Sequence, residues 1–598
     1  MAKAVKGKGT LPLFGIDSTW TAPTEPPNLE GVELLSVDTE THDPFLEDRG
    51  PGILRKQGHI CGVSLASQDG AWYFPIAHAG GNCEWNVADW LQETLAHDRT
   101  YVFANAGYDA EALHSIDAVP AGTWVDVQVD EALLDEESPH GYSLEAIANK
   151  WLGIGKNDEE LMKHAMHYGA QTPKEAKQMM KDLPAGAVGV YAEVDARRTI
   201  DVFLAQQEMI DAQGLREVSD LERRITPLCW QMRRNGIRFN REAAHELNAR
   251  WKHQEEQMLL NIRNSGYRVD PWSSTSLGRY CDLKGLKYAR TEAGAPSFTK
   301  DNFPTSQDPT LREVGQYRKL SKMRRDFIEK WLIASEFDGR IHSTWMQTAS
   351  EEGGTRSGRF GCKNENLQQV PARDPDFGPI MRALFMPEVN ETFMKGDYSG
   401  QEIRIAIHYA MALGCTDAHK VVAQYIADKK FDFHRMIADM ARIERTPAKT
   451  LALGSLYGMS PRKSQVQLGF NKEESERVYN EYHRMAPYFQ ELATKAMQRA
   501  ESHGYVRTFC GRRRHFRDGA FIHKALNSIV QGTAGDQAKT AMVNVWDELE
   551  RVPLLQVHDE LDYSIPDMET GKRIGEIMEE ALPLHVPMYV EVKTGAHW

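Results

Sequence analysis

Acidic residues at the ends of two predicted strands could support metal-assisted chemistry. Residues 393–409 read as a short strand that delivers Asp397 to its end, followed by a tight turn and a helix. Far downstream, an apolar strand stops at Asp559 and Glu560 and then resumes, which predicts a hairpin. A strand-end aspartate is more often only a helix cap. Carboxylates on adjacent strands, however, can hold two divalent cations about 4 Å apart, the arrangement for in-line displacement at phosphorus.

Two basic residues between these acids are spaced for one face of a helix. Thr446 can cap that helix, and Pro447 suits its first position. Four side chains then recur at intervals of four residues: Arg445, Lys449, Leu453 and Tyr457. The simpler alternative is an amphipathic helix that happens to carry two bases. Because both bases lie at the N-terminal end, where the helix dipole is positive, we expect an anion site there.

The three stretches resemble, in order, motifs A, B and C of the family A DNA polymerases. Motif A matches Asp-Tyr-Ser-Gly-Gln-Glu-Ile-Arg, motif B matches the helix just described, and motif C matches Val-His-Asp-Glu. The resemblance implies template-directed addition of dNTPs to a primer 3′ end, with two Mg²⁺ ions, or Mn²⁺ in their place. It implies that the metal ligands are Asp397, Tyr398 and Asp559 and that the catalytic group also includes Glu560 and Lys449. The implied nucleotide-binding residues are Arg445, Lys449, Leu453, Tyr457, Glu402 and His558.

Glu402 corresponds, by this resemblance, to the residue with which the family selects the sugar. A glutamate beside the 2′ position would exclude ribonucleotides by its bulk and through a bond to a neighbouring tyrosine. The alternative is an acid in the first turn of a helix that only complements the helix dipole. Measuring ribonucleotide use after mutation of Glu402 separates these two interpretations.

Residues implied to contact DNA near the primer end are Arg359, Asn366, Gln368, Arg404, Asn527 and Gln531. The resemblance places Arg359 and Gln531 at the minor-groove edge of the nascent base pair. Hydrogen-bond acceptors there occupy nearly the same place in every correct pair. Such contacts would test the shape of the pair without reading its sequence.

A second group of acids lies in the first third of the chain. Asp38 and Glu40 alternate along one strand and therefore share a face, and a later strand is expected to end at Asp109. Tyr191 and Asp195 share a face of a helix predicted over residues 187–213. One Asp-x-Glu is a weak signal, but the ordered set resembles the DEDD proofreading exonucleases of the tyrosine-bearing subclass. The resemblance implies two Mg²⁺ ions held by Asp38, Glu40, Asp109 and Asp195, with Tyr191 orienting the attacking water.

The resulting fold class is multidomain, mixing α/β and α+β parts. A ribonuclease H-like exonuclease domain is expected before a right-hand polymerase domain. The expected bounds are 1–28 for a leader, 29–212 for the exonuclease and 213–598 for the polymerase. Within the polymerase we expect the thumb over about 241–345, the palm over about 346–410 and 520–598, and the fingers over about 411–519.

The net charge of −14 would by itself argue against a nucleic-acid partner. Two basic stretches, 312–330 and 507–517, are expected to line a DNA groove despite this charge, although a basic run is more often only a solvated face. Seven scattered cysteines suit a reducing cytoplasm, that of the host cell if a phage encodes the protein. The expected partners are primer–template DNA and dNTPs, with replisome proteins such as a helicase–primase and a single-strand binding protein as candidates. No apolar run is long enough to predict a membrane partner.

The chain departs from the family pattern at several positions. Gly400 and Gln401 replace the more common Gln-Ile, Leu453 stands where Phe or Tyr is usual, and His523 stands where an arginine is usual. No room is expected before Gly31 for a 5′ nuclease domain. Two other functions remain open at this point. A single-subunit RNA polymerase is disfavoured by the exonuclease acids, and a non-catalytic DNA-binding or scaffold protein is disfavoured by the complete ligand sets.

Overall fold

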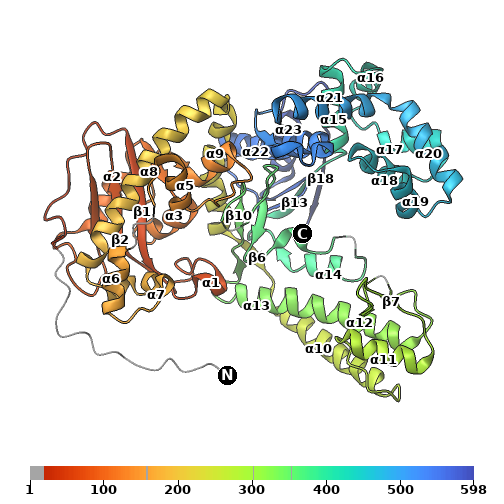
Figure 1. Cartoon of the computed structure of the whole chain (residues 1–598), viewed down its shortest axis with the longest axis horizontal. Coiled ribbons are helices and arrows are strands. Elements are labelled where there is room, and N and C mark those ends of the chain that lie inside the picture. Colours follow the sequence, from red (N-terminus) through yellow and green to blue (C-terminus); the bar gives the residue numbers. More distant parts are fainter. Residues whose placement is uncertain (1–18, 156–158, 301, 352, 373) are drawn as a thin grey trace. The chain divides into compact units, whose positions relative to one another are not determined.

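The computed structural model describes residues 19–598 apart from 156–158, 301, 352 and 373 (Figure 1). Most of the expected leader, residues 1–18, therefore lies outside the described residues. The chain forms two compact units. The first comprises the residues up to Asn235 with Ser343–Asn364 and Met394–Thr594, and the second comprises Gly236–His342, Glu365–Phe393 and Gly595–Trp598.

A five-stranded mixed sheet forms the N-terminal part of the first unit. Its strands, in the order β3-β2-β1-β4-β5, are β3 (Ala71–Pro75), β2 (His59–Ala66), β1 (Leu34–His42), β4 (Thr100–Phe103) and β5 (Thr123–Asp126). β1 pairs antiparallel with β2 and parallel with β4. Leu35 and Val37 are fully buried, as expected for a strand inside a sheet. This part of the chain therefore has the predicted α/β fold, and Asp38 and Glu40 lie on the central strand of the sheet.

Helices accompany this sheet and supply the rest of the acid site (Figure 1). They are α2 (Val87–Leu95), α3 (Ala106–His114), α4 (Val127–Leu134), α5 (Leu144–Leu152), α6 (Glu159–His167), α7 (Pro173–Gln178) and α8 (Ala185–Gln213). The predicted helix over 187–213 is confirmed as α8. Thr172 caps α7, since its hydroxyl accepts a hydrogen bond from the Glu175 N–H at 3.2 Å.

A four-stranded sheet, in the order β16-β17-β13-β18, carries the other acid site. Its strands are β16 (Leu555–Val557), β17 (Glu560–Ile565), β13 (Thr392–Tyr398) and β18 (Val590–Gly595). The elements next to it are α9 (Arg216–Asn235), α15 (Gln401–Ala412), α22 (Ala525–Leu549), α23 (Met568–Glu580) and the hairpin of β10 (Thr344–Met346) with β11 (Gly361–Lys363). The predicted strand, turn and helix around Asp397 are confirmed, with Gly400 at φ 65 where only a residue without Cβ is unstrained.

A helical part follows α15 and shares one apolar core with α15 and α22. Its helices are α16 (Ala418–Ala427), α17 (Phe433–Ala441), α18 (Arg445–Leu456), α19 (Pro461–Leu468), α20 (Lys472–Met485) and α21 (Pro487–His503), followed by β14 (Tyr505–Arg507) and β15 (Arg513–His515). The expected cap of α18 is wrong. The helix begins at Arg445 with Glu444 as the preceding residue, so Thr446 already lies inside it and caps nothing.

The second unit is built on long helices. They are α10 (Arg241–Arg263), α11 (Ser274–Lys284), α12 (Pro309–Met323), a π-helical turn η2 (Arg324–Glu329), α13 (Lys330–Ala334) and α14 (Gly378–Arg382). A small sheet joins β12 (Phe385–Met386), β6 (Ile237–Phe239) and β9 (Arg340–Ile341), and β7 (Ala289–Arg290) pairs with β8 (Pro296–Ser297). Much of the expected thumb falls in this unit, and the finer division into thumb, palm and fingers stays a prediction. Among the described residues, no helix is long and apolar enough to cross a membrane.

Candidate active sites

Two adjacent strands bring Asp397, Asp559 and Glu560 together. Asp397 is the penultimate residue of β13, Asp559 lies in the turn after β16, and Glu560 opens β17. The Tyr398 N–H donates to the Asp559 carbonyl at 3.0 Å, which fixes the register of the two acid-bearing segments. The predicted hairpin is confirmed, and its turn uses His558 in the left-handed region at φ 58. The His558 side chain itself is exposed.

Repulsion between these acids gives the site its electrostatic character. Burial and then the charges of Asp559 and Glu560 raise the pKa of Asp397 to about 7, against the opposing charge of Lys593. Burial also raises the pKa of Asp559. A divalent cation would relieve this repulsion, so the donor set fits a metal site. In the described part of the chain no three His, Cys, Asp or Glu side chains are already arranged to hold an ion.

Tyr398 can serve such a site only through its backbone. Its side chain is 1% exposed, and its hydroxyl donates to the Met578 carbonyl at 2.8 Å. The ring is therefore part of the core between β13 and α23. If Tyr398 is a metal ligand, as the resemblance implies, the ligand atom is its carbonyl oxygen.

Three segments converge on the Glu402 carboxylate beside these acids. Arg359 donates from Nη2 to Oε1 of Glu402 at 2.6 Å, and the Tyr457 hydroxyl donates to Oε2. Burial and the Glu402 charge together raise the pKa of Tyr457, so its hydroxyl remains a donor. Gln531, in the second turn of α22, hydrogen-bonds Tyr457 as well. The expected bond between Glu402 and a tyrosine is present, although the residues involved are far apart in sequence.

The N-terminal end of α18 is rich in cationic groups. Arg445 is half exposed and donates to Asp432 at 2.6 Å, and Lys449 is exposed one turn further on. Leu453, another turn along, is partly buried against the apolar core of this helical part. The face predicted from the spacing of four is therefore open at its basic end and packed at its apolar end.

His434 belongs to this basic end, and the sequence reasoning missed it. It is buried in the first turn of α17, where burial and then the charge of Lys449 lower its pKa to about 4. Nδ1 of His434 has no hydrogen-bond partner among the described residues. A neutral imidazole beside Lys449 and Arg445 adds a hydrogen-bonding group to the site. Its only sequence signal is its place just after the cap Asp432, because the packing of α17 on α18 is a tertiary contact.

The acids of the first sheet surround a cavity of about 870 Å³. Asp38, Glu40, Tyr191 and Asp195 line it, and the Tyr191 hydroxyl bonds Asp195 within α8. Asp109 is not at a strand end as expected. It lies in the first turn of α3, because the chain turns into a helix two residues after β4 ends, and its carboxylate accepts from the Thr39 hydroxyl at 2.7 Å.

Three of these carboxyls, those of Asp38, Glu40 and Asp109, have pKa values above their usual range. Burial and then Asp195 raise the pKa of Asp38 to about 7. Burial and the charges of Asp38 and Asp195 raise the pKa of Glu40 well above its usual range, and burial with Asp38 does the same for Asp109. The mutual effects show that the four carboxylates are close neighbours. This cluster also fits divalent cations.

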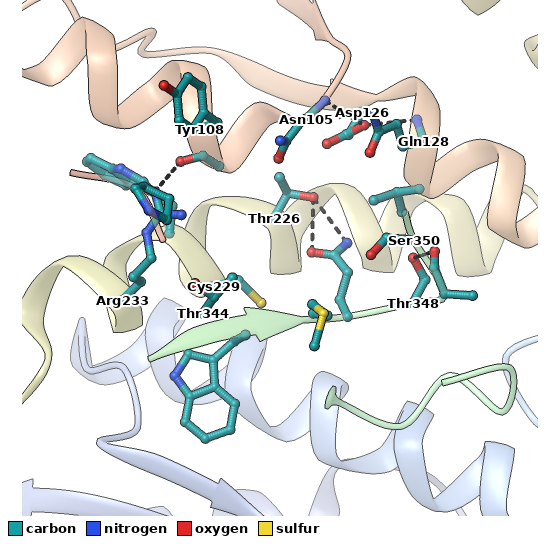
Figure 2. Close-up of a pocket in the computed structure, with 18 residues that line it drawn as sticks. Asn105, Tyr108, Asp126, Gln128, Thr226, Cys229, Arg233, Thr344, Thr348 and Ser350 are labelled. Atoms are coloured by element: carbon teal, nitrogen blue, oxygen red, sulfur yellow. Dashed lines mark hydrogen bonds between the residues drawn. The ribbon is translucent and has the colours of Figure 1, made fainter. Parts of the chain in front are cut away.

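A smaller polar pocket lies beside α9 and β10 (Figure 2). Thr226 and Gln347 hydrogen-bond across it at 3.1–3.3 Å, and Asp126 accepts N–H bonds from Asn105 and Gln128. Its volume is about 100 Å³, which suits ordered water rather than a nucleotide. We therefore assign no substrate to it.

Arg404 is not placed to contact DNA, and its expected role is wrong. The side chain is 2% exposed. Its guanidinium donates to the carbonyls of Ser399, Pro587 and Lys429 at 2.5–2.8 Å and lies over the ring of Tyr425. All of its donor nitrogens are directed into the protein. Arg404 holds the start of α15 in place instead.

The other residues expected to contact DNA have different surroundings. Asn527 and Gln531 lie in the first two turns of α22. In the second unit, the Asn366 side chain accepts from the Gln368 N–H at 3.1 Å and so caps a short turn. The DNA contacts predicted for these residues stay predictions.

Several charges of the two basic stretches have partners within the protein, and the DNA groove expected along them stays a prediction. Arg512 is buried between Glu222 and Asp536, and Arg514 pairs with Glu136 and Glu137 at 2.6–2.7 Å. In the second unit, Arg318, Lys319 and Arg324 bind Pro271, Asp374 and Glu255 respectively. Lys322, Arg325 and Lys330 remain exposed there.

Comparisons with known proteins agree with this geometry. The chain matches the family described as DNA polymerase family A over residues 240–598 and a 3′-5′ exonuclease family over residues 27–211. A DNA-directed DNA polymerase of Pseudomonas phage M6 is 31% identical, over 98% of this chain and 97% of the relative. DNA polymerase DpoZ of Salmonella phage PMBT28 is 29% identical, over 90% and 92%.

A solved structure has the same fold. It is described as the POL domain of Pol1 from M. smegmatis in complex with DNA primer-template and dNTP. It aligns with a TM-score of 0.77 over 95% of this chain and 96% of that chain, at 20% identity. Together with the family matches, these findings show that the chain belongs to the family A DNA polymerases and carries a 3′-5′ exonuclease domain before its polymerase domain.

Proposed function

We propose that Asp397, Asp559 and the Tyr398 carbonyl hold two Mg²⁺ ions at the polymerase site, where Mn²⁺ can substitute. Glu560 completes the acid group. Enzymes of this family generally use divalent metal ions, and the raised pKa of Asp397 supports a cluster that needs positive charge. Bound ions would stabilise the charge on the transferring phosphoryl group and make the primer 3′-hydroxyl a better nucleophile.

The basic end of α18 binds the triphosphate of the incoming nucleotide. Arg445, Lys449 and the imidazole of His434 supply the contacts. The primer 3′-hydroxyl gives its proton to solvent as its oxygen forms a bond to the α-phosphorus, and the bond from that phosphorus to the oxygen that bridges it to the β-phosphorus breaks. Lys449 then gives a proton to the departing pyrophosphate. Leu453 packs against the sugar, and Tyr457 lies near the templating base.

Glu402 excludes ribonucleotides by occupying the space beside the 2′ carbon. Its carboxylate is supported by donors from both Arg359 and Tyr457. Primer–template DNA and dNTPs are the substrates, as in the solved complex with the same fold. In the first unit, we assign contacts with the primer end and the nucleotide to Arg359, Gln531, Asn527 and His558. In the second unit, we assign contacts with DNA to Asn366 and Gln368.

The exonuclease domain removes mispaired 3′ ends. Asp38, Glu40, Asp109 and Asp195 hold two Mg²⁺ ions, and Tyr191 orients the water that attacks the terminal phosphodiester. The bond between Tyr191 and Asp195 supports this orientation. The phage relatives support a role in phage genome replication, in the cytoplasm of a host cell and alongside replisome proteins.

One observation carries these assignments: two separate clusters of mutually repelling carboxylates lie in two different sheets. Replacing Asp397 or Asp559 by Ala should abolish primer extension and leave the degradation of single-stranded DNA. The double change Asp38→Ala with Glu40→Ala should do the reverse. Gel assays of both activities on each folded variant test this, and loss of both activities from either change would contradict the assignment.

A further inference from the structure

The exonuclease cavity contains a lysine that the expected acid set does not explain. Lys174 and Lys177 of α7 and Arg198 of α8 line the cavity together with the carboxylates. Arg198 is already engaged, with Nη1 3.6 Å from Asp195 and Nη2 donating to the Gly155 carbonyl at 3.0 Å. Lys177 is exposed to the cavity, and its charge lowers the pKa of both Asp38 and Glu40 against the effect of burial.

The segment that presents Lys177 is anchored. At the N-terminal end of α7, the Glu175 carboxylate accepts from the Gln171 N–H at 2.6 Å, and the Thr172 hydroxyl accepts from the Glu175 N–H at 3.2 Å. Ala176, the residue before Lys177, is fully buried. His78 holds the following turn through the Met180 carbonyl at 2.8 Å. The Lys177 side chain therefore projects from an anchored segment of the cavity wall.

We propose that Lys177 is a catalytic residue of the exonuclease, whose ammonium contacts a non-bridging oxygen of the scissile phosphodiester. This inference rests on the proposed role of the four acids. Single-stranded DNA brings negative charge into a cavity lined by carboxylates, and Lys177 is an exposed cation that lines the same cavity. An ammonium on the phosphate would offset that repulsion and stabilise the extra charge of the transition state.

The chemical step is a hydrolysis that Lys177 assists without being consumed. The water oxygen forms a bond to the terminal phosphorus as the bond from phosphorus to the 3′-oxygen of the preceding nucleotide breaks. One hydrogen of the water ends on that 3′-oxygen, and the other passes to solvent as the nucleoside monophosphate ionises. Lys177 keeps its proton and its charge throughout.

The test compares Lys177→Met, which removes the charge but keeps an unbranched side chain, with Lys177→Arg, which keeps the charge. Lys181→Met is the matched control, because Lys181 follows on the same segment but does not line the cavity. Degradation of a labelled single-stranded oligonucleotide is measured in single turnovers at saturating Mg²⁺. We expect Lys177→Met to be slower by roughly ten- to hundredfold, Lys177→Arg to keep most of the rate and Lys181→Met to equal the parent.

A second measurement tests binding of the oligonucleotide in the absence of metal ions. In the Asp38→Ala, Glu40→Ala background with EDTA, Lys177→Met should weaken binding of the same oligonucleotide several-fold, because one phosphate contact is lost. Lys181→Met should not change it. Primer extension by each variant reports that the protein is folded.

The competing explanation is that Lys177 only neutralises the empty acid cluster. In that case Lys177→Met reaches the parent rate at saturating Mg²⁺, needs less Mg²⁺ to do so, and binds the oligonucleotide as before; this result overturns the inference. If the parent has no nuclease activity that depends on Asp38 and Glu40, the proposed function fails as well. If the parent and both Met variants degrade the oligonucleotide at the same rate, the inference about Lys177 is wrong and the proposed exonuclease activity stands.

Discussion

At the scale of single residues, the polymerase site depends on how one carboxylate is held. Glu402 receives Arg359 at one oxygen and Tyr457 at the other, so both oxygens are fixed in direction. A side chain held at two points cannot rotate away from an incoming sugar without breaking charged hydrogen bonds. The same contacts would be unnecessary for an acid that only complements the dipole of α15.

Glu402→Ala should increase ribonucleotide incorporation, because it opens the space beside the 2′ carbon. Tyr457→Phe removes one donor and leaves the carboxylate, so we expect a smaller increase. Competitive incorporation of NTPs and dNTPs measures both, in an Asp38→Ala, Glu40→Ala background. If Glu402→Ala excludes NTPs as well as the parent does, the sugar is selected elsewhere.

Leu453 makes a second prediction about the sugar. Leucine has no hydroxyl that could stand in for a missing 3′-OH, and it lies partly buried on the face of α18. The native protein should therefore discriminate against dideoxynucleotides, and Leu453→Tyr should reduce that discrimination by roughly ten- to hundredfold. Leu453→Phe, which adds a ring without a hydroxyl, is the control. Competitive incorporation in the exonuclease-inactive background gives the ratio, and efficient dideoxynucleotide uptake by the parent would contradict this account.

At the scale of elements, the start of α15 is held by a buried arginine. Three carbonyls from three segments accept from Arg404, and each would lose its partner if the guanidinium were removed. Buried carbonyls without donors are costly, so this residue stabilises the junction between β13 and α15. Asp397 and Glu402 lie on either side of that junction.

Arg404→Met should lower the free energy of unfolding by roughly 2–4 kcal/mol, since the apolar chain is kept but the three carbonyls lose their donor. Arg435→Met is the control, because Arg435 forms only an exposed pair with Asp439 and should change stability by less than about 1 kcal/mol. Urea denaturation measures both variants. If the Arg404→Met protein keeps the parental stability but binds DNA more weakly, Arg404 contacts DNA as the sequence predicted.

At the scale of the whole molecule, two distant sites share one electrostatic design. Asp38 in the first sheet and Asp397 in the second each have a pKa of about 7, with burial as the largest cause and neighbouring acids next. Because the chain belongs to the family A DNA polymerases, the RNA polymerase alternative is excluded. Polymerase and exonuclease domains of these families both generally use divalent metal ions. Each cluster must lose protons before it can bind a divalent cation.

Divalent metal affinity of both sites should therefore rise as the pH rises through about 7. Below pH 7 a proton on the raised carboxyl competes with the metal, so the apparent affinity should fall about tenfold per pH unit for each competing proton. Calorimetric titration with Mn²⁺ at pH 6, 7 and 8 measures this. The Asp397→Ala and Asp38→Ala, Glu40→Ala variants isolate one site each, and an affinity independent of pH from 6 to 8 would contradict the prediction.

The sequence by itself determined the local parts of both sites. The strand, turn and helix around Asp397, the hairpin at Asp559 and the Tyr191–Asp195 pair on α8 all follow from patterns within about ten residues. Backbone hydrogen bonding has a fixed period in strands and helices, so residue spacing is enough to place side chains on a shared face.

Only the tertiary structure decided which charges are free and which are used. Arg404 bonds Pro587 and Arg514 bonds Glu136, partners 183 and 378 residues away. The placement of His434 beside Lys449 likewise depends on helix packing that no spacing encodes. A buried charge must find a partner wherever the fold supplies one, because leaving it unpaired costs more than the contact itself returns. The use of each base is therefore a property of the folded chain rather than of the run of sequence in which it stands.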